Sequence, residues 1–290
     1  MKTPKQIESL IEEGLVDSVI CQLMSGKEAL VYVVQCGSEL RCAKVYKETH
    51  RRNFRHSANY TEGRYLKNFR RTREIQKRSC FGKVAREEAW QNTEINALCR
   101  LNAAGVKVPR YINFFEGVLL MELITDSQGN VAPRLNDIRL TTEQAKAYHA
   151  LLINQVVRML CRGMIHGDLS EYNVLLGSQG PVIIDFPQAI YAVENNNARW
   201  LLKRDIDNIT KYFSRFSPEL AKTDFGSEIW SLYERGKLDW DTPLTGVLVE
   251  THKPVNIDGL LKTIDSVMKK ELAWQRYKQE RWTSQRSLAF

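Results

Sequence analysis

HGDLSEYN (residues 166–173) and VIIDF (residues 182–186) are the two stretches that decide the fold of this 290-residue chain. The run before Asp185 is apolar and β-branched, a pattern typical of a strand that delivers a carboxylate to a site. Asn173 and Asp185 supply oxygen atoms, the ligands that a hard cation such as Mg²⁺ prefers. Asp168 can accept or orient the proton of an attacking hydroxyl. The two stretches therefore predict one polar site at neighbouring strand ends.

An alternative interpretation of HGDLSEYN is an ordinary surface turn, since Asp, Ser, Glu and Asn are common turn residues. The flanking sequence argues against it. A helix-like apolar stretch (Leu151–Met164) precedes the motif, and a hairpin is predicted after it. The hairpin joins NVLL (Asn173–Leu176) to PVIID (Pro181–Asp185) around Gly177–Gly180. The position of the motif between a helix and a hairpin favours a functional site over a surface turn.

The spacing resembles the catalytic loop of protein kinases, H-R-D-L-x-x-x-N, which is followed by a metal-binding Asp. His166, Asp168 and Asn173 fall at the required offsets. Gly167 replaces the usual Arg. The resemblance implies phosphoryl transfer, which depends on positioning and charge neutralisation more than on covalent help. We expect His166 to support the loop and to take no part in the chemistry.

Composition sets few limits on the function. The chain is 43% hydrophobic and 26% charged, as globular proteins are, and it has no apolar run long enough to span a bilayer. The polar N-terminus is unlike a signal peptide. Six cysteines are scattered without a C-x-x-C pair, which favours a cytoplasmic protein with reduced thiols, mostly in the core, and no zinc site.

The net charge of +8 comes from one segment. Between Lys47 and Glu88 there are 13 Lys/Arg and 5 Asp/Glu, an excess equal to that of the whole chain. Aromatic residues alternate with the basic ones in His50–Arg78, a combination that suits RNA through phosphate contacts and stacking. A solvated loop with a few anchoring aromatics is the other interpretation.

The first part of the chain predicts a helix and a small sheet. Thr3–Leu15 has helical apolar spacing. Ser25, Gly26 and Lys27 form either a turn that faces phosphates or a plain hairpin turn, and a strand follows. Lys44 lies in a second strand, RCAKVY, where it binds phosphates or faces solvent at an edge; its distance after the turn favours phosphates.

A helix over Ala85–Leu101 carries Glu94 beside its apolar stripe, which makes Glu94 the candidate partner of Lys44 in preference to Glu87 and Glu88. Two strands with a turn at Glu116-Gly117 follow within Tyr111–Ile124. In a kinase this is the place of the hinge, so backbone groups of Glu122 and Ile124 are expected to meet an adenine edge.

Two long helices frame the motif. Thr141–Gly163 is the first, with Thr141 or Thr142 as its cap. Arg199–Phe213 is the second and is expected to pack under the site. Its Asp205 either supports the catalytic loop or forms a surface ion pair, and we favour the ion pair.

Several motifs together resemble the RIO family of atypical protein kinases, whose patterns are S-T-G-K-E-A, H-x-D-L-S-E-[FY]-N and I-D-x-x-Q. The second and third recur intact, the third ending at Gln188, and the first reads Met-Ser-Gly-Lys-Glu-Ala. The resemblance covers Met24–Phe216 and is greatest to the branch without an N-terminal winged helix, bacterial members in particular.

The family implies an α+β, two-lobed protein-kinase-like fold, with a small β-rich N-lobe, a mainly helical C-lobe, and no activation segment or peptide-docking helices. The corresponding regions are an N-terminal helical extension (1–22), an N-lobe (23–124) with a basic insert (47–84), a C-lobe (125–236) and a C-terminal extension (237–290) of unknown role.

The family also implies ATP and Mg²⁺ or Mn²⁺ as cofactors, and roles for individual residues. By position these are ATP binding for Ser25, Lys27, Lys44, Glu122 and Ile124, pairing with Lys44 for Glu94, catalysis for Asp168, metal binding for Asn173 and Asp185, and possible phospho-acceptance for Asp185. Ser/Thr protein kinases usually have a Lys at the position of Ser170. The RIO pattern has a Ser there, as this chain does.

Three functions fit these residues. The first is a RIO-like serine protein kinase that acts on an unknown protein and on itself. The second is an RNA- or ribosome-associated ATPase switch that uses an aspartyl-phosphate and the basic insert. The third is a small-molecule kinase of the aminoglycoside or choline type, which the basic C-terminal region disfavours because such substrates are cationic.

Overall fold

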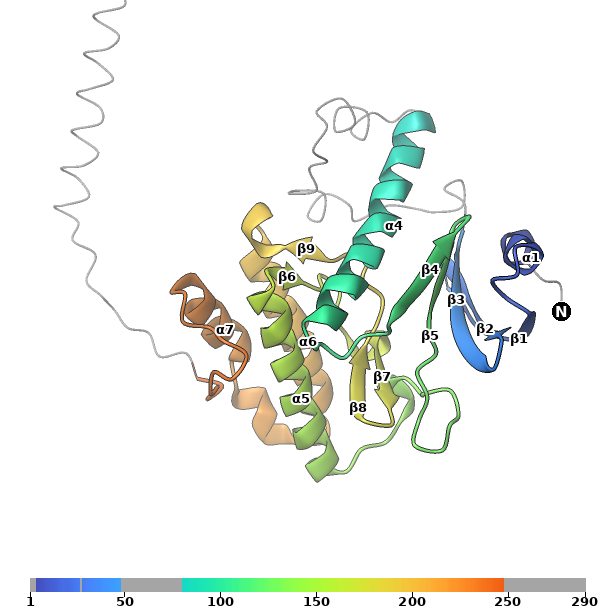
Figure 1. Ribbon diagram of the computed structural model, residues 1–290. Helices are drawn as coiled ribbons and strands as arrows, with labels where there is room; N and C mark the ends of the chain where they lie inside the picture. The colour runs from blue at the N-terminus through green and yellow to red at the C-terminus, as the bar shows by residue number, and fades with distance from the viewer. Residues whose placement is uncertain (1–3, 27, 48–79, 248–290) are drawn as a thin grey trace, which may run out of the picture. The chain divides into compact units, whose positions relative to one another are not determined.

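The computed structural model describes residues 4–26, 28–47 and 80–247, which belong to one compact unit, Met1–Leu248 (Figure 1). For residues 80–91 it describes the backbone alone. The predictions for Lys27, for the basic insert between residues 48 and 79, and for the chain after residue 247 lie outside the described residues.

The N-terminal part is a five-stranded antiparallel sheet in the order β1-β2-β3-β5-β4. Its strands are β1 (Ser18–Ser25), β2 (Ala29–Cys36), β3 (Glu39–Tyr46), β4 (Tyr111–Phe115) and β5 (Val118–Glu122). Glu116 and Gly117 join β4 to β5 with positive φ angles of 45° and 76°, the combination that a two-residue type I′ turn requires. The predicted turn at this place is confirmed.

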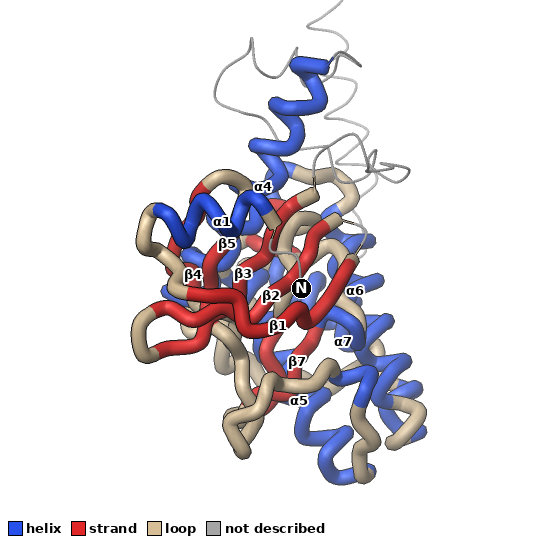
Figure 2. The backbone as a smooth tube through the Cα atoms, turned by 90° about the vertical axis from the view of Figure 1, so that its right-hand side faces the viewer, coloured by secondary structure: helices blue, strands red, loops and turns tan. Residues whose placement is uncertain are grey.

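An N-terminal helix, α1 (Lys5–Glu12), lies across one face of the sheet (Figure 2). Ile7 and Leu10 are buried against side chains from three strands, which include Tyr32, Ala43 and Leu120. The apolar spacing that predicts this helix therefore marks the residues that cover the sheet. The helix covers one face of the sheet, and the opposite face of the sheet remains available for contacts with the rest of the molecule.

The helical part begins with α4 (Cys80–Ala103), which extends beyond the predicted Ala85–Leu101 at both ends. It continues with α5 (Thr142–Cys161), α6 (Ala198–Phe213) and α7 (Phe225–Glu234). Thr141 caps α5 in a capping box with Gln144, so the first of the two candidate caps is the correct one. Short 3₁₀ turns are η2 (Leu135–Asp137), η3 (Glu171–Asn173), η4 (Ala192–Glu194) and η5 (Pro218–Lys222).

Two small sheets connect these helices. β7 (Val174–Gly177) pairs with β8 (Gly180–Ile183), which is the predicted hairpin, and β6 (Met164–Ile165) pairs with β9 (Ile190–Tyr191). Residues 186–197 alone separate Asp185 from α6, so the chain lacks the long activation segment of typical protein kinases. The two-lobed, kinase-like fold that the family resemblance implies is the fold observed (Figure 1).

The thiols differ from the prediction of mostly core cysteines. Among the described residues Cys42 is buried and Cys36 is half-buried, whereas Cys21, Cys99 and Cys161 are exposed; all five are free thiols. Apolar neighbours in sequence do not decide which face of a strand or helix a thiol occupies. Within the described ranges, no helix is both long and apolar enough to cross a membrane.

His149 on α5 provides a test of the packing between helices. The residue is 2% exposed, its Nε2 lies 2.9 Å from Thr210 Oγ1 on α6, and burial lowers its pKa to about 4. Because the folded pKa is below the unfolded value, the neutral ring stabilises the protein above pH 6.5, and this contribution is lost as the pH falls from 6.5 toward 4.

We therefore expect His149→Gln to remove part of the acid sensitivity of folding. Between pH 7.5 and 5 its free energy of unfolding should fall by about 2 kcal/mol less than that of the unmodified protein. Urea denaturation at both pH values measures the difference, and other titrating groups cancel in the comparison. Equal losses in the two proteins would contradict the role of burial.

Candidate active site

Lys44 and Glu94 form a buried ion pair between β3 and α4. Lys44 Nζ lies 2.7 Å and 3.0 Å from the two carboxylate oxygens, and the side chains are 8% and 2% exposed. Tyr46 lies two residues after Lys44 on the same strand face, and its hydroxyl donates to Glu94 Oε2 at 2.5 Å. The carboxylate is thus held by two strand residues, of which sequence analysis identified one.

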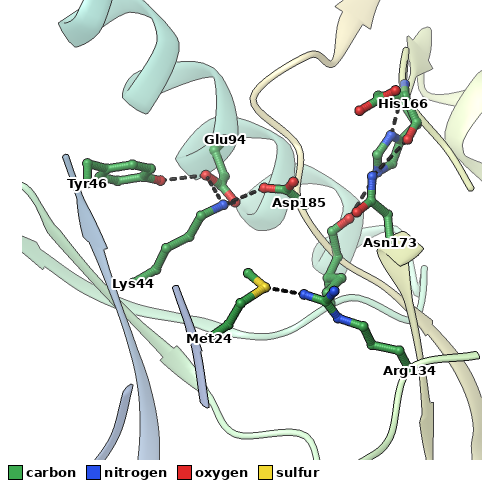
Figure 3. Close-up of polar contacts among 10 residues, drawn as sticks. Met24, Lys44, Tyr46, Glu94, Arg134, His166, Asn173 and Asp185 are labelled. Atoms are coloured by element: carbon green, nitrogen blue, oxygen red, sulfur yellow. Dashed lines mark hydrogen bonds and ion pairs between the residues drawn. The ribbon is translucent and has the colours of Figure 1, made fainter. Parts of the chain in front are cut away.

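Lys44 also contacts the carboxylate that ends the second motif. Its Nζ lies 2.5 Å from Asp185 Oδ1, so one ammonium bridges carboxylates of Glu94 and Asp185 (Figure 3). Burial would lower the pKa of Lys44, but the charges of Asp185 and Glu94 outweigh it and raise that pKa. Burial would raise the pKa of Asp185, but the charge of Lys44 lowers it. Both groups stay ionised across the physiological range.

Asp185 has an uncommon backbone conformation. Its φ of 71° lies in the left-handed region, which Asp and Asn enter more readily than other residues with a side chain. Its side chain is 42% exposed, in contrast to the buried Lys44 and Glu94. The sharp change in chain direction after β8 therefore leaves this carboxylate accessible.

His166 joins the two motifs. Its Nδ1 accepts from the backbone N–H of Asp168 at 3.2 Å, so its Nε2 carries the proton and donates to the carbonyl of Ile184 at 3.0 Å. Burial lowers its pKa to about 4, which keeps the ring neutral. A neutral ring with both nitrogens engaged in backbone contacts supports the loop, as sequence analysis expected.

Asp168 and Asn173 both lie in the 166–173 loop. Asn173 Nδ2 donates to the backbone carbonyl of Asp168 at 2.8 Å, and the Asn173 carbonyl accepts from the N–H of Ile184. The Asp168 side chain is exposed, and the described part of the chain makes no hydrogen bond to its carboxylate. Partial desolvation by neighbouring protein atoms raises the pKa of Asp168, and the positive charge of Arg204 opposes this increase.

The 166–173 loop is held in place by residues on one face of α6. Gly167 has a φ of 82°, and its N–H donates to Asp205 Oδ2 at 2.7 Å, while the N–H of Leu169 donates to Asp205 Oδ1 at 3.1 Å. The Gly167 carbonyl accepts from Arg204, and the Leu169 carbonyl from Asn208 Nδ2 at 3.2 Å. Three helix residues thus fix four backbone groups around Asp168.

The favoured prediction for Asp205, a surface ion pair, is wrong. The residue is 1% exposed, and its carboxylate accepts from the two loop N–H groups. Burial raises its pKa to about 7, against the lowering effect of the Gly167 N–H and Arg204. The prediction failed because Asp205 is 36 and 38 residues from Leu169 and Gly167, and sequence spacing alone does not show that its helix face packs against the loop.

We expect Asp205→Asn to lower the free energy of unfolding by about 1–3 kcal/mol and to lower the turnover rate as well. One of the two loop N–H groups would face an amide NH₂ and lose its acceptor. Urea denaturation and steady-state kinetics measure the two effects. Asp207→Asn is the matched control, because Asp207 is exposed on the same helix in an (i, i+4) pair with Lys203. Equal stability of both variants would refute the support role.

A cavity of about 500 Å³ opens beside Lys44 and Asp185. Its roof comes from β1–β3, its floor includes Leu175 and Ile184, and its lining also contains Asn173. Most of the remaining lining side chains are apolar, as is usual for a ligand site with a few fixed polar groups. The apolar part and the charged end suit a ligand with a flat base and an anionic tail.

The end of β5 and the two residues after it, Glu122, Leu123 and Ile124, also line this cavity. The Ile124 carbonyl accepts from Ala132 at 2.9 Å. Its N–H has no acceptor among the described residues. Ile124 therefore keeps one backbone donor that faces no acceptor in the described part of the chain.

The turn between β1 and β2 is closed by its own backbone. Gly26 N–H donates to the Ala29 carbonyl at 2.9 Å, and the Gly26 carbonyl accepts from Lys47 Nζ at 2.5 Å. Ser25 is not among the residues that line the cavity, whereas Met24 before it is. The Gly26 N–H is thus engaged within the turn and is not left for a phosphate.

The sequence also matches the model of one protein family. The model of the RIO domain matches residues 30–225. The chain belongs to the RIO family. The RIO-type serine/threonine-protein kinase Rio1 of Haloferax volcanii is 34% identical over 72% of this chain and 68% of its own length.

Other RIO relatives are longer than the matched region. Serine/threonine-protein kinase RIO1 of Chaetomium thermophilum is 28% identical over 89% of this chain, and that of Homo sapiens is 28% identical over 72%. The matches cover 49% and 35% of those two proteins. The chain therefore spans about half of their length or less.

The donor atoms of this RIO chain fit a hard divalent cation. Asn173 uses its Nδ2 on the Asp168 carbonyl, which leaves its Oδ1 for a ligand, and Asp185 has a second carboxylate oxygen beside the one that contacts Lys44. Within the described residues, no group of three or more His, Cys, Asp or Glu gathers as a closed metal site. Few protein ligands suit Mg²⁺, which keeps waters and shares substrate phosphates.

Proposed function

We propose that this RIO chain is a serine/threonine-protein kinase that uses ATP with Mg²⁺ or Mn²⁺ and also phosphorylates itself. The observation that carries the proposal is Lys44, which bridges Glu94 and Asp185 at the charged end of the cavity. The names of its RIO relatives support the same activity.

In this proposal each residue has one task. The backbone of Glu122 and Ile124 binds the adenine edge, and Lys44 positions the phosphates at the charged end of the cavity. A metal ion held by Asn173 and Asp185 would neutralise charge on the phosphate oxygens. Ser25 and Lys27 belong to the phosphate-side turn by their position in the RIO motif.

Asp168 is the residue that meets the substrate hydroxyl. Its exposed carboxylate orients the hydroxyl and takes its proton as the oxygen attacks the γ-phosphorus, while the bond from that phosphorus to the bridging oxygen breaks and ADP leaves. His166 and the α6 residues hold the loop in place during this step. The reaction thus relies on a rigid loop and fixed charges, as the loose phosphoryl transition state requires.

A second candidate function is an ATPase switch that acts on RNA or the ribosome. Its support is Asp185, whose carboxylate is 42% exposed and can attack the γ-phosphorus, release ADP and be hydrolysed afterwards. The basic insert (47–84) would bind the nucleic acid. The free thiols of the described residues suit a cytoplasmic setting for either function.

The experiment is incubation with γ-labelled ATP and Mg²⁺, followed by acid and hydroxylamine treatment of the labelled protein. Label that survives both treatments is phosphoserine or phosphothreonine and supports the kinase. Label lost to hydroxylamine is an acyl-phosphate and supports the ATPase switch. Salt-sensitive RNA binding that is reduced on neutralising Arg70, Arg71 and Arg73 would add the nucleic-acid partner. No label and no ATP turnover would refute both functions.

A further inference from the structure

Arg134 lies on the floor of the cavity, and its backbone is fixed there. It forms a β-bridge with Leu175, and the preceding Pro133 carbonyl accepts from the N–H of Leu176 at 2.9 Å. The Arg134 carbonyl accepts from the N–H of Asp137 at 3.0 Å, which closes the start of η2. The side chain therefore begins at a defined point opposite the sheet.

From this point the side chain crosses the cleft. Its guanidinium contacts the sulfur of Met24 on β1, so Arg134 links the helical part to the strand that enters the phosphate-side turn (Figure 3). Arg134, Lys44 and Asp185 line the same cavity. A cation thus stands at the charged end of the site in addition to the predicted lysine.

The present partner of Arg134 is a weak one. A thioether is a poor acceptor, whereas a guanidinium presents five donors in a planar fork. In the described part of the chain, no carboxylate lies within ion-pair distance of Arg134, and the contact with Met24 is the one hydrogen bond of its side chain. Lys44, by comparison, is engaged by Glu94 and Asp185. Arg134 therefore keeps its donors for a ligand.

We infer that Arg134 is a nucleotide-binding residue whose guanidinium leaves Met24 and binds anionic oxygens of the phosphate chain of ATP. This inference rests on the proposed function. Planar, bidentate recognition of phosphate oxygens is what a guanidinium does best, and it costs little here because the contact that is lost is weak. The charge of Arg134 also reaches Asp185, whose pKa it helps to lower.

One consequence is an exchange of contacts on nucleotide binding. In the free protein Arg134 joins the floor of the cleft to β1 through Met24. In the bound protein the same guanidinium joins the floor to the phosphates. The residue would thereby favour ATP over a bare nucleoside, since adenosine offers it no anionic oxygen.

The test is calorimetric titration of the full chain with Mg²⁺ and a non-hydrolysable ATP analogue, and with adenosine. For Arg134→Gln we expect at least tenfold weaker binding of the analogue, with adenosine affinity within about twofold of the unmodified protein. Arg134→Lys should fall between, because it keeps the charge and loses the fork. Arg139→Gln is the matched control, an exposed arginine of the same connection outside the cavity lining.

Two outcomes overturn the inference. One is unchanged affinity of Arg134→Gln for the analogue. The other is an equal loss for adenosine, which would place Arg134 on the nucleoside or show that it only shapes the pocket. If the glutamine variant fails to fold, Arg134→Lys provides the test. Phosphate recognition by the guanidinium is refuted if this variant binds both the analogue and adenosine with the affinities of the unmodified protein. If the unmodified protein does not bind the analogue, the proposed function itself fails.

Discussion

Asp185→Asn is expected to abolish ATP turnover, with a loss of about 10³-fold or more. The substitution removes the charge that faces Lys44 and the proposed cation site, and it keeps the size of the side chain. Asparagine also accepts the left-handed backbone at this position, where φ is 71°. Lys44 retains Glu94, so the fold should persist. Release of labelled phosphate from ATP measures the turnover.

Thermal denaturation accompanies this measurement, so that loss of activity is separated from loss of fold. Asp241→Asn is a suitable control because it removes an exposed aspartate outside the cavity lining. A rate near that of the unmodified protein, with a native melting curve, would show that Asp185 is not part of the reacting site.

Lys44→Met is expected to lose both activity and stability. Turnover should fall by about 10²–10³-fold, on the scale seen when one electrostatic group is removed from a transition state. The free energy of unfolding should fall by about 3 kcal/mol, because Glu94 is left as a buried carboxylate without its cation. Urea denaturation and labelled-phosphate release measure the two losses on the same preparation.

The double variant Lys44→Met/Glu94→Gln separates these two losses. A glutamine carbonyl still accepts from the Tyr46 hydroxyl and carries no charge, so most of the stability should return. Activity should not return, because nothing then replaces the ammonium at the phosphates. Recovery of turnover together with stability would mean that Lys44 acts by holding the fold alone.

The elements that sequence analysis predicted are those whose pattern is local. Thr141 and Gln144 mark the start of α5 within one turn, and Glu116-Gly117 defines the hairpin between β4 and β5. The strand β1 (Ser18–Ser25) was not predicted. Its pairing with β2 slips at two places, so its half-buried positions do not alternate regularly with the exposed ones and the strand carries no clear period.

The residues of the site likewise fall into those that a local sequence pattern identified and those that it did not. Asp168, Asn173 and Asp185 are set by spacing along one stretch, and Glu94 was selected by the apolar stripe of its helix. Tyr46 was available from its (i, i+2) position beside Lys44 but was not recognised. Asp205 and Arg134 reach the site from segments packed on it in three dimensions, and no local pattern reports such packing.

The anchoring of the catalytic loop by α6 has a consequence for motion. Loops that bind ligands usually open at little cost, whereas the amides of Gly167 and Leu169 donate to a carboxylate on a buried helix face. They should therefore exchange their hydrogens with solvent as slowly as the amides in the middle of α6. The loop that carries Asp168 then belongs to the last part of the molecule to unfold, and adaptation to a ligand falls to the segments around it.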